Sequence, residues 1–263
     1  MSLGMTESVI KRDRMIVMLG LAGVIGLSWL YTLYMAWGLG LGIDLDICGP
    51  LVATWGTTQF LLVFGMWSVM MVAMMAPSVS PFVLMFATIN RKRREQDNPF
   101  VPTSIFFLGY LLVWIGYSAL ATIVQWGLHS AALLSPFMVS TSPYLGGALL
   151  IGAGLFQWTP IKHACLDKCR SPLGFMMTEW RDKAKGALIM GLKHGYECVM
   201  CCWMLMLLLF VAGVMNLLWM GMITAFLLIE KLVPAGDKVS KPSGVFFILC
   251  GVLMIVTNTT FLS

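Results

Sequence analysis

The sequence predicts an all-α fold, a polytopic bundle of about seven transmembrane helices that forms one integral membrane domain over residues 1–263. Three observations favour this fold class. Hydrophobic residues make up 59% of the chain and charged residues only 11%, which excludes an ordinary soluble domain. Apolar stretches long enough to cross a bilayer recur along the whole chain. The alternating pattern of a membrane β-barrel is absent, and lipid cannot satisfy the edges of an open sheet.

The apolar stretches give the expected spans in order. They cover residues 16–38, 59–89, 102–128, 144–160, 187–212, 214–231 and 243–262. The first span follows the basic sequence KRDR and is too long for a signal-peptide core, so we expect an uncleaved signal anchor. The longest polar stretch, about 161–186, separates the fourth span from the fifth.

The placement of charge predicts the orientation of these spans. With the N-terminus inside, all 17 Lys and Arg residues fall in inner segments. The outer loops contain Asp44, Asp46 and His129 but no Lys or Arg. Because cations are retained on the cytoplasmic side, we expect the N-terminus inside and the C-terminus outside. The formal net charge of +5 then reflects topology and does not indicate a nucleic-acid partner.

The second span contains two prolines, Pro77 and Pro81, one helical turn apart. Each proline removes a backbone N–H donor, so we expect a kink or a break near Ala76. Met70 and Met74 stand one turn apart just before this point, and thioether sulfur suits soft metals. Since methionine stripes usually fill gaps in a core, these two residues are secondary candidate ligands.

The fifth span begins with the sequence KHGYECVMCCW at residues 193–203. At about 100° per residue, its polar and thiol side chains share one helix face, and these residues are His194, Glu197, Cys198, Cys201 and Cys202. Ionisable groups inside a bilayer are costly and indicate a functional site. Thiolate and imidazole ligands select copper or zinc over hard cations. Glu197 is a further secondary candidate, since it could neutralise a bound cation, carry a proton or pair with Lys193.

A second thiol group follows the fourth span, which Pro160 should close. His163, Cys165 and Cys169 come directly after it, with a spacing that is not that of a zinc finger. Because this segment and the start of the fifth span are expected at the same cytoplasmic face, the two thiol groups could share a metal ion.

Three motifs carry a resemblance to a known family. They are W-x-x-M-x-x-A-M-M-A-P-x-x-x-P at 67–81, TPIKHACLDKCRSPLGF at 159–175, and CVMCCWMLMLLLFVAGVMNLLWM at 198–220, followed by EKLVPAG at 230–236. The chain resembles a bacterial family of predicted metal-binding integral membrane proteins, the domain of unknown function 2182. The resemblance implies a multi-span protein of the bacterial inner membrane with a metal site. By motif position it points to Cys165, Cys169, Cys198, Cys201 and Cys202, with His163 and His194 beside them.

These observations favour a membrane protein that binds a soft metal, with Cu(I) the first candidate and zinc the second, for metal transport, delivery or homeostasis. One alternative is an accessory or assembly subunit of a larger membrane complex with lateral protein partners. Another is a thiol-disulfide oxidoreductase that uses Cys198 and Cys201. The sequence contains no nucleotide-binding loop and no hydrolytic motif, so we do not expect an enzyme. The lipid bilayer is the first expected partner.

Overall fold

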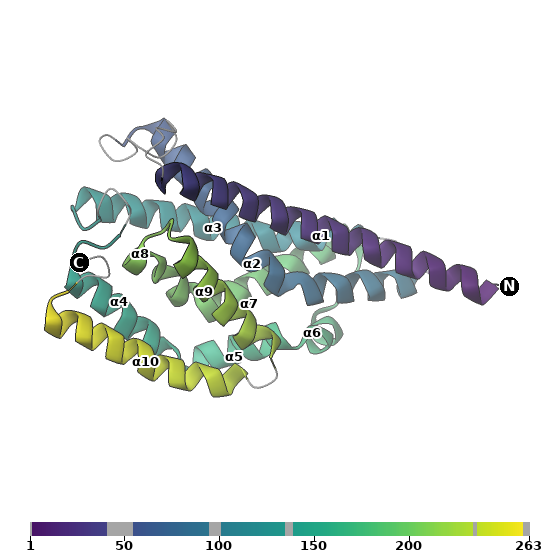
Figure 1. The fold of residues 1–263 in the computed structure, drawn as a ribbon. Coiled ribbons are helices and arrows are strands. Elements are labelled where there is room, and N and C mark those ends of the chain that lie inside the picture. The colour runs from purple at the N-terminus through teal and green to yellow at the C-terminus, as the bar shows by residue number, and fades with distance from the viewer. Residues whose placement is uncertain (1, 41–54, 95–100, 135–138, 234–235, 260–263) are drawn as a thin grey trace.

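The computed structural model describes residues 2–40, 55–94, 101–134, 139–233 and 236–259. These residues form ten α-helices, and the described part of the chain contains no β-strand (Figure 1). The helices are α1 Ser2–Gly40, α2 Thr57–Arg94, α3 Thr103–Ser130, α4 Pro143–Phe156, α5 Pro160–Arg170, α6 Pro172–Glu179, α7 Lys183–Leu207, α8 Leu209–Ala212, α9 Leu217–Leu232 and α10 Gly236–Thr257. The predicted all-α class is confirmed.

Five helical segments are long and apolar enough to cross a membrane. They are Arg14–Trp37, Thr57–Arg93, Thr103–Ser130, Lys183–Ala212 and Lys238–Thr257. The other two expected spans correspond to α4 and α9, which have 14 and 16 residues. At 1.5 Å per residue these helices measure about 21 and 24 Å, less than the ~30 Å hydrocarbon core. A total of seven spans therefore stays a prediction.

Helices α3, α4, α5 and α9 pack against α7, which is the most buried of the five long segments. In Figure 1, α1 runs along one side of the bundle, and the pair α4 and α10 runs along the other. The most extensive contact is between α3 and α7. Gly109 and Gly191 meet there, because a Cβ on either glycine would collide with the backbone of the other helix. Such close approach of small residues is typical of membrane helix pairs.

Helix α2 runs through both of its prolines without a break. Pro77 cannot donate to the carbonyl of Ala73, four residues earlier. The indole Nε1 of Trp29 donates to that carbonyl instead, at 3.0 Å. The helix therefore does not break near Ala76, because α1 supplies the hydrogen bond that the proline removes. A kink at this point stays a prediction.

The polar stretch after the fourth span is mostly helical, as α5 and α6. Both helices begin with a hydroxyl residue followed by proline, at Thr159-Pro160 and Ser171-Pro172. The Thr159 and Ser171 hydroxyls accept hydrogen bonds from backbone N–H groups three residues later, at 3.3 and 3.2 Å. A capping residue before a proline at the first helical position is a recognised start signal. Helix α5, which begins in this way, packs against α7 and α9.

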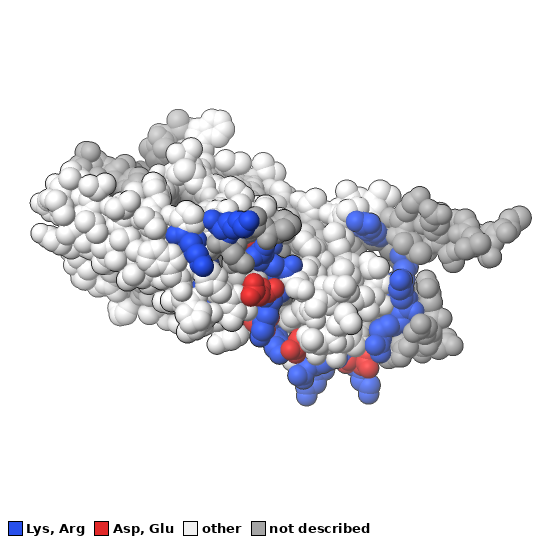
Figure 2. Space-filling view, turned by 90° about the horizontal axis from the view of Figure 1, so that it is seen from below, with Lys and Arg blue, Asp and Glu red and all other residues white. Residues whose placement is uncertain are grey.

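Charged side chains are unevenly distributed along the bundle. On the face in Figure 2, Lys and Arg lie in the middle of the molecule and toward the end where α1 begins, while the opposite end shows none among the described residues. The start of α1 and the end of α10 lie at opposite ends of the bundle (Figure 1). This arrangement is compatible with the expected orientation, with the N-terminus inside and the C-terminus outside, which stays a prediction.

Candidate metal centre

Four cysteines from two helices face one another in the interior. Cys169 on α5 and Cys198, Cys201 and Cys202 on α7 are all buried. The Sγ atoms of Cys169 and Cys201 are 4.0 Å apart. The side chain of Cys198 interacts with those of Cys169, Cys201 and Cys202. We call these four residues the cysteine cluster.

The helical spacing of α7 holds three of these thiols together. Cys201 and Cys202 follow Cys198 by three and four residues, so their side chains lie over the same turn. Their thiols donate to the backbone carbonyl of Cys198, at 3.1 and 2.9 Å. These bonds satisfy the thiols without a ligand and turn them toward one another.

A buried lysine reaches the cysteine cluster from α9. The Nζ of Lys231 lies 2.9 Å from the Sγ of Cys198 and 3.9 Å from that of Cys202. The hydroxyl of Tyr110 lies 3.2 Å from the same Cys198 sulfur and donates to the carbonyl of Met75 at 3.1 Å. Side chains from α3, α5 and α9 therefore meet at Cys198 of α7. Sequence reasoning identified neither Lys231 nor Tyr110 as part of the site.

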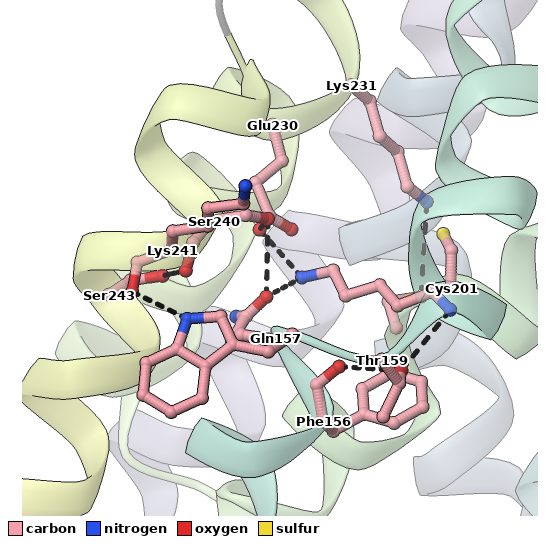
Figure 3. Close-up of polar contacts among 12 residues, drawn as sticks. Phe156, Gln157, Thr159, Cys201, Glu230, Lys231, Ser240, Lys241 and Ser243 are labelled. Atoms are coloured by element: carbon pink, nitrogen blue, oxygen red, sulfur yellow. Dashed lines mark hydrogen bonds and ion pairs between the residues drawn. The ribbon is translucent and has the colours of Figure 1, made fainter.

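The neighbouring residue, Glu230, belongs to a second polar centre. Its Oε1 pairs with the Nζ of Lys162 at 2.7 Å, and Gln157 and Ser240 complete the network. Figure 3 shows Glu230 and Lys231 extending from α9 in different directions. A charged residue at the end of an apolar span usually extends to the membrane interface, but Glu230 and Lys231 are buried, at 1% and 4% exposure. Each has a buried partner on another helix.

Cys165 is the outermost of the candidate thiols. It lies on α5 one turn before Cys169 and is only half-buried. Burial raises its pKa above the ordinary thiol value, and the nearby Cys201 and Glu197 add to the effect. The pKa of Cys169 is raised much further, first by its contacts with Cys198 and Cys201. Both shifts favour the neutral form of these thiols over the thiolate.

Glu197 pairs with α5 and not with Lys193. Its Oε1 lies 2.9 Å from the Nζ of Lys168, which raises the pKa of that lysine. Its other oxygen, Oε2, is buried without a hydrogen-bond partner. Glu197 also lines a pocket of about 280 Å³ between α5, α6 and α7. Lys193 pairs with Glu179 instead, at 2.5 Å.

The two candidate histidines lie on different helices and differ in burial. His163 is half-buried on α5, outside that helix's buried face. His194 is buried and stacks on the ring of Phe82, with 3.8 Å between ring centroids. Its ring also lies 5.7 Å from that of Tyr110, which contacts Cys198. The Nδ1 atom of His194 is buried without a hydrogen-bond partner, so it is free to act as a ligand.

The candidate methionines lie in the core of the bundle. Met70 and Met74 are buried on α2, which packs against α9. They are therefore not lipid-facing. Their role as ligands stays a prediction.

The cysteine cluster is not a preformed cage for a metal ion. Within the ranges that the structure describes, no three or more His, Cys, Asp or Glu side chains are arranged to hold one. An ion that accepts two thiolates needs less preorganisation than a tetrahedral zinc ion, which takes four ligands. Soft sulfur donors suit both Cu(I) and zinc better than they suit hard cations.

A family model described as the copper chaperone PpoB2 matches residues 64–254. The chain belongs to the PpoB2 copper chaperone family. The matched range contains the cysteine cluster, Lys231 and both candidate histidines. A copper-related family, predicted from the thiols and the motifs, is thus confirmed, although the match does not carry the name domain of unknown function 2182. No curated protein and no solved structure matches the chain.

Proposed function

We propose that this member of the PpoB2 family binds Cu(I) as its cargo through pairs of thiolates in the cysteine cluster. The observation that carries the proposal is the 4.0 Å separation between the Sγ atoms of Cys169 and Cys201. Twice a metal–thiolate bond of ~2.3 Å is about 4.6 Å, so an ion fits between these atoms after a shift of less than an ångström. The two sulfurs come from different helices and are buried, so water does not compete for the ion.

The thiols are also arranged so that an ion could pass from one to the next. Cys165 is half-buried, Cys169 lies one turn further along α5, and Cys201 and Cys198 follow on α7. Sites in series that bind without trapping are what movement of an ion requires. We infer that copper enters at Cys165 and passes inward to Cys198, with His194 beside the inner end.

The membrane is the proposed setting of this transfer. Five helices of the chain could cross a bilayer, and α7, which carries three thiols of the site, is one of them. We infer that this bilayer is a bacterial inner membrane. The short loops of the protein leave little surface for a soluble partner. We therefore expect the protein that receives the copper to lie beside this one in the bilayer. Delivery to a copper-containing membrane complex would unite the chaperone role with that of an assembly factor.

The test is the metal content of protein purified in detergent and reconstituted with Cu(I) without oxygen. We expect about one copper per chain in the wild type and none in the triple variant C198S/C201S/C202S. The matched control is C250S, because Cys250 is a half-buried thiol on α10, outside the cluster. Copper retained by the triple variant, or absent from the wild type, would contradict the proposal.

A further inference from the structure

Lys231 is a buried cation for which the described part of the chain offers no carboxylate partner. Its side chain is 4% exposed, and its Nζ contacts the sulfurs of Cys198 and Cys202. The nearest carboxylate along the chain, Glu230, is already paired with Lys162. A buried ammonium is costly unless an anion compensates it. The partner that the structure gives to Lys231 is therefore the cysteine cluster itself.

The net charge of a Cu(I) complex with two thiolates is equal and opposite to that of the Lys231 ammonium group. Two thiolates and one Cu(I) ion carry a single net negative charge, which one ammonium group cancels. A third thiolate would leave a negative charge uncompensated in the interior, where charge is expensive. We propose that Lys231 is the counter-ion of a two-thiolate Cu(I) complex in the cysteine cluster. This inference rests on the proposed function and adds to it a residue that is not a ligand.

The geometry allows this role without displacing the lysine. A thiolate sulfur has more than one lone pair, so Cys198 can bind an ion while it accepts the hydrogen bond from the Nζ of Lys231. The hydroxyl of Tyr110 approaches the same sulfur from α3. Groups that hydrogen-bond to a ligand orient it and adjust its affinity for the metal. Lys231 thus acts by its charge on an ion held in the cysteine cluster, and also through Cys198 when the ion has passed to that sulfur.

Lys231 could instead fill the place of the metal ion in the metal-free protein. The two roles predict opposite changes in Cu(I) affinity when the lysine is removed. If the ammonium only fills the place of the metal ion, its removal should make copper bind more tightly. If it is the counter-ion, removal should weaken binding, because a charged complex is then left without compensation. The direction of the change in Cu(I) affinity therefore separates the two roles.

The experiment is an anaerobic competition titration with a Cu(I) chelator on detergent-purified full-length protein. K231M keeps the length of the side chain and removes its charge, whereas K231R keeps the charge. K238M is the matched control, because Lys238 is an exposed lysine on α10. We expect K231M to lose about 10- to 100-fold in Cu(I) affinity, as for other groups that support a metal ligand. K231R and K238M should remain close to the wild type.

A second measurement on the wild type keeps the inference testable if K231M does not fold. X-ray absorption at the copper edge should report two sulfur ligands per Cu(I), as charge compensation by one lysine requires. Three or more sulfur ligands, or unchanged or tighter binding by K231M, would overturn the inference and leave copper binding intact. A wild type that binds no Cu(I) would overturn the proposed function and the inference together.

Discussion

Lys162 and Glu230 form a 2.7 Å ion pair between α5 and α9, with both side chains buried. Both of its helices also contribute to the site, because Lys231, which contacts the cysteine cluster, follows Glu230 on α9, and Cys169 of the cluster follows Lys162 by seven residues on α5. It joins the helix that carries Cys169 to the helix that carries Lys231. We infer that the pair keeps these two helices in register at the metal centre.

Removing one member of this pair should destabilise the protein strongly. E230Q leaves the ammonium of Lys162 buried without a charge partner, at an expected cost of about 3–5 kcal/mol. The double variant K162M/E230M removes both charges and should cost less than either single change. Unfolding in detergent, followed by circular dichroism, measures the difference.

The control for this prediction is the exposed pair between Arg93 and Asp182. Their side chains approach to 2.6 Å but are 32% and 60% exposed. R93Q should change the free energy of unfolding by no more than about 1 kcal/mol, because water screens this pair. Equal costs for E230Q and R93Q would show that the buried pair does not hold the helices.

The hydrogen bond from Trp29 to Ala73 should depend on Pro77. W29F leaves the carbonyl of Ala73 without its donor at 3.0 Å, and we expect it to cost about 1–3 kcal/mol. P77A restores a backbone N–H that can reach the same carbonyl within α2. W29F should therefore cost less in the P77A background than in the wild type. A double-mutant cycle of unfolding free energies measures this coupling, and additive costs would contradict the explanation.

Cys165 should react slowly with alkylating reagents at neutral pH. Burial raises its pKa, so the neutral thiol persists to higher pH than in a peptide. Its alkylation rate should reach half its maximum above pH ~8.5, the ordinary thiol value. E197Q removes a negative neighbour and should move this midpoint to lower pH. Residue-resolved mass spectrometry of protein pulsed with iodoacetamide gives the profile, and a midpoint below the peptide value would count against the described environment.

The sequence was most informative where one helix carried the whole pattern. The spacing of Cys198, Cys201 and Cys202 placed three thiols on one face of a span, and the structure buries all three on α7. The all-α class followed from the composition and from the length of the apolar stretches. Both inferences depend on local patterns, which a single sequence contains.

The parts that could not be predicted depend on contacts between helices. A lysine at a helix end usually extends to the membrane interface, so nothing in the sequence around Lys231 indicated that it turns inward to Cys198. Pro77 suggested a break, since its replacement donor, Trp29, is 48 residues away in the sequence. The sequence placed His194 on the same helix face as Cys198, but it did not indicate that the His194 ring stacks on Phe82 of α2. Thr159-Pro160 and Ser171-Pro172 are signals from which the starts of α5 and α6 could have been predicted. The polar composition of residues 161–186 suggested a loop instead of helices.

The central claim is that α5 and α7 share one Cu(I) ion, and single-cysteine variants test it most directly. Anaerobic Cu(I) affinities should be measured for C169S, C201S and the control C250S. We expect C169S and C201S each to bind at least about tenfold more weakly, the equivalent of about 1.4 kcal/mol, and C250S to bind like the wild type. Wild-type affinity in C169S would contradict the account, because copper would then be held by α7 alone.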